Sequence, residues 1–225
     1  MTALPLECYY AIFNNLLHNY KSLFSCALVS RHWCRIIIPI LWSEPGNHYK
    51  DKRLIRILLL ALNAEEQTLL IPFNISLPSH QKTLFEYTSY ITSITSDLII
   101  GVRNLFPKYE SNLSLETTVK FSLIAMLVRT SINLKHLIID EIICNPLIFE
   151  NLYEKTTLTS VDLYLKYNIS GDLEYKAIDG LVKILYKNST LNSLNLRSAT
   201  LGTKGVITLL EALCNDTVLK SLEEK

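Results

Sequence analysis

Cysteine and histidine, the side chains that most often carry chemistry, are scattered along this chain of 225 residues. Cys34 follows His32 by two positions, and a neighbouring cysteine and histidine can form an activated thiol nucleophile. Residues two apart on a helix point to different sides, so this pair indicates a thiol in a core or an interface. The chain carries no GxSxG, P-loop or HExxH pattern. We therefore expect a protein that is not an enzyme and binds no cofactor.

The cysteines argue against both a disulfide framework and a zinc site. They are odd in number and form no CxxC pair. They are Cys8, Cys26, Cys34, Cys144 and Cys214. This pattern fits a reducing compartment, so we expect no metal and a cytoplasmic location, with the nucleus as the alternative.

Composition narrows the class of protein further. Hydrophobic residues make up 49% of the chain and charged residues 19%, which predicts a folded protein. The formal net charge is +1, from 22 basic and 21 acidic side chains, and gives no field that would gather nucleic acid. Apolar runs stay far below the ~18 residues of a membrane span, and no leader opens the chain. We expect no membrane association and no secretion.

Three short helices are expected at the N-terminus. Apolar residues from 6 to 18 recur with the spacing of one helical face. Ser22 can cap a second helix that reaches Val29, and Ser30 can cap a third that ends at Pro39.

An ordered set of motif residues runs through these three helices. It reads Leu4-Pro5-Leu6-Glu7, Ile12-Phe13, Leu16, Ser22-Leu23, Leu28-Val29-Ser30-Arg31, Trp33, Ile37, Pro39 and Leu41-Trp42. The set resembles the F-box, a family whose members bind the Skp adaptor and, through it, a cullin. The resemblance departs at residues 19–21, where many members carry an acidic residue.

The resemblance implies a set of residues that contact the Skp adaptor. They are Leu4, Pro5, Ile12, Phe13, Leu16, Leu23, Leu28 and Val29. Trp33, Ile37 and Trp42 belong either to this interface or to the core.

The middle of the chain gives weaker signals. Breaker residues at 43–50 predict a linker, and Asp51 can cap a helix that extends to Leu62. Residues 68–115 carry short apolar runs that fit a strand or a buried helix equally well, and we assign them no structure.

A repeated pattern follows. The spacing LxxLxL occurs at 134–139, 158–163 and 191–196, and a further start falls at Leu219. These starts are separated by 24, 33 and 28 residues, and a period in this range is typical of a solenoid built from strand, turn and helix. The last repeat stops at Lys225 soon after it begins, which indicates a repeat region that is cut short.

These repeats resemble leucine-rich repeats of the ribonuclease-inhibitor type. That resemblance implies that the leucines point inward and that the residues between them line a concave binding face. The outward residues are His136, Ile138, Asp140, Ser160, Asp162, Tyr164, Ser193, Asn195 and Arg197. We expect all of these except Ile138 and Ser160 to contact a target. Ala199 stands where such repeats carry Asn or Cys, so we expect an irregular solenoid without that hydrogen-bond ladder.

Together these patterns predict an α+β / α/β solenoid in three parts. Residues 1–45 form the F-box, 46–115 a linker with irregular entry repeats, and 116–225 a short leucine-rich-repeat horseshoe with parallel strands and outer helices. The expected function is a non-catalytic adaptor that brings a protein target to a Skp-cullin-F-box ubiquitin ligase. The alternatives are a repeat scaffold without ligase association and a small hydrolase with an unrecognised pocket.

Overall fold

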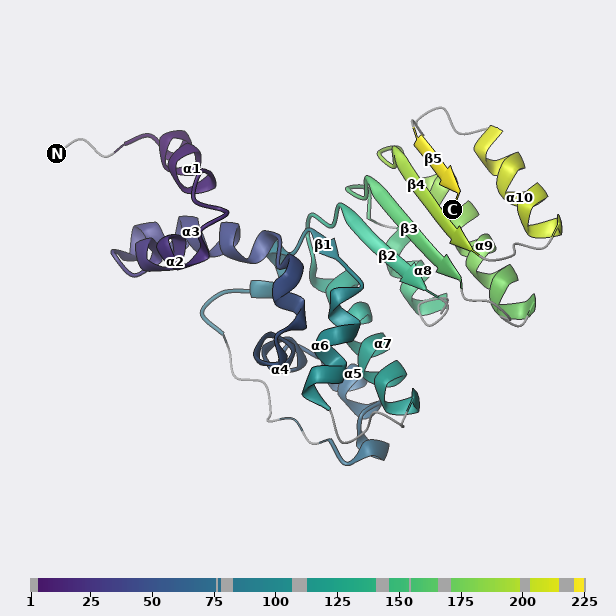
Figure 1. The fold of residues 1–225 in the computed structure, drawn as a ribbon, viewed down its shortest axis with the longest axis horizontal. Coiled ribbons are helices and arrows are strands. Elements are labelled where there is room, and N and C mark those ends of the chain that lie inside the picture. The colour runs from purple at the N-terminus through teal and green to yellow at the C-terminus, as the bar shows by residue number, and fades with distance from the viewer. Residues whose placement is uncertain are drawn as a thin grey trace.

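The computed structural model describes residues 4–75, 77, 83–106, 113–140, 146–153, 155–165, 171–198, 203–214 and 221–224. A group of short helices lies at one end of the molecule, a parallel sheet with its own helices at the other, and a helical block between them (Figure 1). Two hydrophobic cores correspond to this arrangement, one in the N-terminal helices and one that runs from Tyr49 to Ala212.

The N-terminal unit consists of three helices. They are α1 (Leu6–Asn14), α2 (Tyr20–Ala27) and α3 (Arg31–Ser43). Ser30 caps α3 as predicted, and its side chain accepts a hydrogen bond from the Trp33 amide at 3.1 Å. The expected cap of α2 was wrong: Asn19 accepts the Ser22 amide at 3.1 Å, so the helix starts two residues before Ser22.

The ends of all three helices also differ from the prediction, and the second ends at Ala27 rather than at Val29. The first helix ends at Asn14 rather than at residue 18, and tight turns then reverse the chain toward α2. The third helix continues through Pro39 to Ser43. Proline removes one hydrogen bond, but Ile36, Ile37 and Ile40 are buried on both sides of it, so packing of that face outweighs the loss.

The segment predicted as a linker is packed against the block that follows. It forms a short 3-10 helix, η1 (Gly46–Lys50), and Tyr49 is fully buried. The Tyr49 hydroxyl donates to the carbonyl oxygen of Ser93 at 2.9 Å, and burial raises the pKa of this phenol well above its usual value. The backbone of η1 lies directly against α6 (Asp97–Leu105), where Gly101 leaves room for it.

The rest of the central block is helical. Its elements are α4 (Lys52–Leu59), α5 (Ala64–Thr68), η2 (Ile71–Phe73), η3 (Tyr87–Tyr90) and α7 (Leu113–Thr130). Asp51 caps α4 as predicted, through its side chain and the Arg53 amide. Glu66 in α5 forms two hydrogen bonds of 2.9 Å with Arg129, which joins α5 to the end of α7.

A five-stranded parallel sheet completes the fold, with its strands in the order of the sequence. The strands are β1 (Ser93–Ile94), β2 (His136–Asp140), β3 (Ser160–Leu165), β4 (Ser193–Ser198) and β5 (Ser221–Glu224). The helices between them are α8 (Pro146–Tyr153), α9 (Gly171–Lys187) and α10 (Thr203–Cys214), and they cover one face of the sheet (Figure 1). Right-handed crossovers between successive parallel strands place each helix on the same side.

The inward residues of the LxxLxL pattern form the core beneath this sheet. Leu134, Leu137, Leu158, Val161, Leu163, Leu191, Leu194 and Leu196 are all buried. Ile91, before β1, and Ile94, within it, occupy the first two positions of the same pattern and are also buried. The sheet therefore begins one unit earlier than the pattern predicted.

A ladder of side-chain hydrogen bonds joins successive repeat units. Its members lie three residues before the first leucine of each LxxLxL segment. Ser131 Oγ donates to the Thr88 carbonyl at 3.3 Å, and Lys155 Nζ donates to the Ser131 carbonyl at 2.6 Å. Asn188 Nδ2 donates to the Lys155 carbonyl at 3.0 Å. The sequence analysis concerned a different ladder, the one that leucine-rich repeats form with Asn or Cys at the position of Ala199. Ala199 lies outside the described residues.

The Asn188 side chain makes several hydrogen bonds in addition to the one in this ladder. Its Oδ1 also accepts the amides of Thr190 and Leu191, at 2.7 and 2.9 Å. We expect Asn188→Ala to lower the free energy of unfolding by about 2–3 kcal/mol, because buried backbone groups would lose their partners. Urea denaturation followed by circular dichroism measures the change.

Asn192→Ala is the matched control, since that side chain makes no hydrogen bond within the described part of the chain. We expect a change within about 0.5 kcal/mol for the control. Equal effects of the two substitutions would contradict a structural role for the Asn188 ladder.

Candidate functional site

Large hydrophobic side chains are exposed on the N-terminal helices. They are Leu4, Leu6, Tyr10, Ile12, Phe24, Leu28 and Val29, and we call this set the N-terminal apolar surface. Leu28 is 72% exposed and Val29 64%, both at the end of α2. Exposed apolar side chains concentrated in so short a segment are typical of a protein contact surface.

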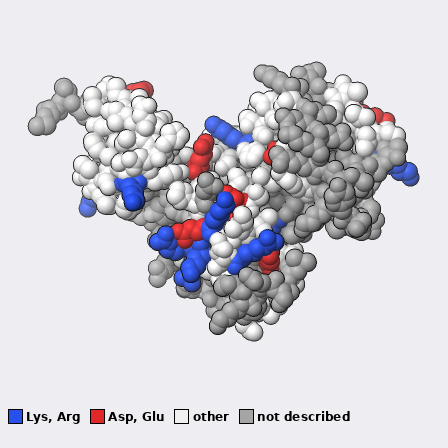
Figure 2. Space-filling view, in the orientation of Figure 1, with Lys and Arg blue, Asp and Glu red and all other residues white. Residues whose placement is uncertain are grey.

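Charge is sparse on this part of the molecule. Figure 2 shows the N-terminal unit mainly in white, whereas lysine, arginine and acidic side chains gather over the central helices. A surface with few charges loses little hydration energy when a partner covers it. The N-terminal apolar surface is therefore suited to a contact made by apolar side chains.

The structure divides the residues expected to contact the Skp adaptor into two groups. Leu4, Pro5, Ile12, Leu28 and Val29 are exposed. Phe13 and Leu23 are fully buried in the N-terminal core, and Leu16 is half-buried against it. These three position the surface rather than form it.

Sequence reasoning missed three members of the surface, namely Leu6, Tyr10 and Phe24. Leu6 and Tyr10 are four residues apart on α1, the spacing of one helical face, and this spacing was a signal that could have found them. Phe24 had no such signal, because it directly follows the buried Leu23.

Aromatic packing holds the two faces of α1 in place. Phe13 meets the Trp33 ring edge to face at 5.2 Å between centroids, and Tyr9 meets the same ring at 6.2 Å. Trp33 and Ile37 thus belong to the N-terminal core. Trp42 packs elsewhere, against Tyr87 in the central block, with ring centroids 4.7 Å apart.

The end of α3 is bonded to the start of the sheet. The Ser43 carbonyl accepts both the amide and the hydroxyl of Thr92, each at 2.8 Å. The Thr92 carbonyl then accepts the amides of Lys135 and His136, and the same paired bond recurs at the start of β3 and of β4. A continuous series of backbone hydrogen bonds therefore connects the N-terminal unit to the sheet.

The outward residues of the strands line up in rows across the sheet. The first row holds His136, Ser160 and Ser193, the second Ile138, Asp162 and Asn195, and the third Asp140, Tyr164 and Arg197. The side chains of Asp140 and Arg197 are outside the described part. Those of His136, Asp162, Tyr164, Ser193 and Asn195 are half-buried, so they form a shared surface rather than protrude singly.

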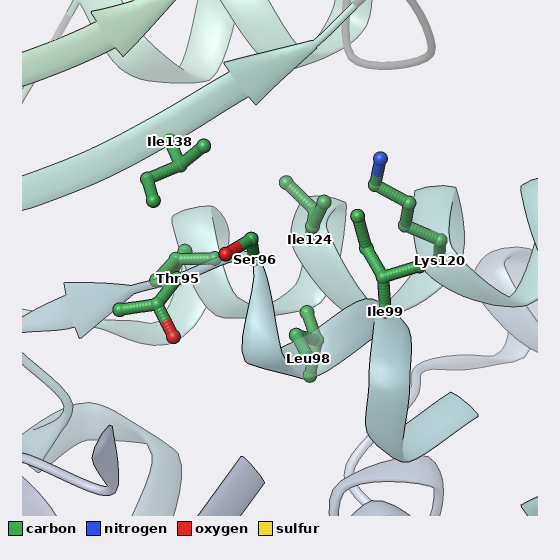
Figure 3. Close-up of a pocket in the computed structure, with 8 residues that line it drawn as sticks. Thr95, Ser96, Leu98, Ile99, Lys120, Ile124 and Ile138 are labelled. Carbon is green, nitrogen blue, oxygen red and sulfur yellow. The ribbon is translucent and has the colours of Figure 1, made fainter. Parts of the chain in front are cut away.

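A small hollow lies beyond β1, between α6, α7 and β2 (Figure 3). Its walls are mostly apolar, with Leu98, Ile99, Ile124 and Ile138 among them. Figure 3 shows the Lys120 ammonium and the Thr95 hydroxyl pointing in different directions, so they do not converge on a substrate position.

The described residues hold no cluster of three or more metal-ligating side chains. Among them, no helix is long and apolar enough to cross a bilayer. Cys34 is half-buried and, like the described Cys8, Cys26 and Cys214, is a free thiol.

Comparison with protein families identifies the N-terminal unit. Residues 1–48 match the F-box-like family, a range that contains all three N-terminal helices. The chain therefore carries an F-box-like domain, and this domain supports its description as an F-box protein. No curated protein and no solved structure gave a match.

Proposed function

We propose that this protein is a substrate-recruiting adaptor of a Skp-cullin-F-box ubiquitin ligase. F-box domains generally bind the Skp adaptor in such complexes, and an F-box-like domain covers residues 1–48 here. The observation that carries the proposal is the N-terminal apolar surface on this domain, whose large hydrophobic side chains are exposed in the described part of the chain.

The proposed partner contact is made by apolar side chains at both ends of the surface. Leu4 and Ile12 come from the start of the domain and from α1, and Leu28 from the end of α2. Phe13 and Leu23 beneath them are fully buried and keep the helices in register. Each central anchor that a partner covers typically contributes ~2 kcal/mol or more to binding.

The remainder of the chain is proposed to be a short leucine-rich-repeat horseshoe that binds the target. The sequential order of the parallel strands, the repeated buried LxxLxL positions and the two recurring hydrogen-bond patterns support this assignment. The target then lies on the open face of the sheet, opposite the helices. The protein itself catalyses no reaction, and it raises the effective concentration of the target near the ubiquitin carrier.

The test is reconstitution of the full chain with a purified Skp adaptor. We expect the two proteins to elute together as a one-to-one complex in size-exclusion chromatography. We also expect calorimetry to show saturable binding, from which the dissociation constant is obtained. A folded protein that forms no complex would overturn the ligase assignment and leave a repeat scaffold as the better description.

A further inference from the structure

The exposed side of α4 combines basic and apolar side chains. It consists of residues at positions i, i+1, i+4, i+5 and i+8, the spacing of one helical face. They are Lys52, Arg53, Arg56, Ile57 and Leu60, all exposed, and we call this set the outer face of α4. The opposite side of the helix, with Ile55, Leu58 and Leu59, is buried in the central core. The outer face is therefore one continuous strip that points to solvent.

Positive charge on the outer face is only partly neutralised within the chain. The helix α4 contains no acidic residue. Arg53 forms an ion pair with Asp51 at 2.6 Å, and this carboxylate also accepts the Arg53 amide. Lys52 and Arg56, in contrast, form no ion pair with another described residue. Two adjacent positive charges are thus left for a partner.

Helix stability does not account for these side chains. Lys52 and Arg53 are the first two residues of α4, where the positive end of the helix dipole disfavours cations. Ile57 and Leu60 are 46% and 44% exposed, so they contribute little to the core. Residues that lower stability or leave apolar area in water are typical of a surface that serves a contact.

The size and composition of the outer face favour a protein partner over a membrane or a nucleic acid. Two apolar side chains are too few to insert into a lipid interface, which takes a large apolar face. The outer face has no aromatic side chain on which a base could stack, and the formal net charge of the chain is only +1. A helix that carries both carboxylates and apolar side chains matches both features of the strip.

We propose that the outer face of α4 binds an acidic amphipathic helix of a partner protein. Carboxylates of that helix pair with Lys52 and Arg56, and its apolar side chains cover Ile57 and Leu60. The helix α4 lies in the block between the N-terminal helices and the sheet (Figure 1). The contact is therefore additional to those proposed for the Skp adaptor and for the target, and it rests on neither.

The test uses the full chain and a fluorescent peptide made of repeated Glu-Leu-Ala-Ala units, which are good helix formers. Companion peptides carry lysine in place of glutamate, or serine in place of leucine. Fluorescence anisotropy measures their binding at low salt, where exposed charges are least screened. We expect the acidic apolar peptide to bind most tightly and to lose affinity as the salt concentration rises.

Lys52→Gln combined with Arg56→Gln is expected to weaken binding of the acidic apolar peptide about tenfold, since each exposed ion pair contributes about threefold. Lys176→Gln combined with Lys204→Gln is the matched control, because it removes two exposed positive charges from α9 and α10. We expect the control to leave binding unchanged.

Equal weakening by the two double variants would overturn the inference, as would an acidic apolar peptide that binds no better than its companions. Vesicles that contain phosphatidylserine are measured in parallel. If they retain the chain through Lys52 and Arg56 while the peptide does not bind, the outer face of α4 contacts a membrane and the proposal is wrong.

Discussion

Replacing Ile12 and Leu28 together by alanine is expected to weaken binding of the Skp adaptor at least about hundredfold, since central apolar anchors typically contribute ~2 kcal/mol or more each and 1.4 kcal/mol is a factor of ten. Ile12 is 48% exposed and Leu28 72%, so their truncation removes contact area without opening a core. Calorimetry with the purified adaptor measures the loss, and thermal unfolding shows that the variant remains folded.

Ile57→Ala combined with Leu60→Ala is the matched control. These side chains on and after α4 are 46% and 44% exposed, yet they lie outside the F-box-like domain. Unchanged affinity is expected for the control. If the control weakens binding as much as the first variant, the N-terminal apolar surface is not the contact. Leu16 is unsuitable for this test, because it packs against the N-terminal core.

Gly101→Ala is expected to destabilise the protein by about 3 kcal/mol, at the upper end of the range for overpacked cores. A methyl group at this position of α6 would overlap the Tyr49 carbonyl oxygen and lie 2.8 Å from Ile55 Cγ1. The first neighbour is backbone, held by the buried Tyr49, so it has little freedom to move. Urea denaturation measures the effect.

Gly180→Ala provides the comparison within another helix, α9. There the added methyl group would meet the Phe149 ring at 2.5 Å, and a side chain can turn away where a backbone cannot. Alanine also favours a helix over glycine by up to ~1 kcal/mol, so we expect a net change within about 1 kcal/mol. A similar loss in both variants would show that contact with the Tyr49 backbone is not the cause at Gly101.

Local patterns predicted the N-terminal helices well, and tertiary packing explains the errors. Ser30 and Asp51 were identified as caps because a cap depends on residues only two or three positions away. The end of α3 was placed wrongly at Pro39, because burial of Ile37 and Ile40 is a property of the folded unit. The spacing of residues on α1 likewise did not show that Phe13 belongs to the core.

The sheet could be predicted where its pattern was complete. Leu134, Leu158 and Leu191 each begin a full LxxLxL segment, and each precedes a strand of five or six residues. At β1 the pattern has only its first two apolar positions, Ile91 and Ile94, and the strand has two residues, so the shortened pattern resembled an irregular segment. The unsatisfied side-chain oxygens of Thr95 and Asn195 could not be predicted, because hydrogen-bond satisfaction depends on neighbours from other strands.

The bond between Ser43 and Thr92 bears on the solubility of the protein. An unprotected edge strand offers free backbone groups to other chains and promotes aggregation. Next to β1, the Thr92 amide is bound by Ser43 and the Ser93 carbonyl by the Tyr49 hydroxyl. The end of α3 and the turn after it therefore act as a cap that keeps these backbone groups from pairing with a second molecule.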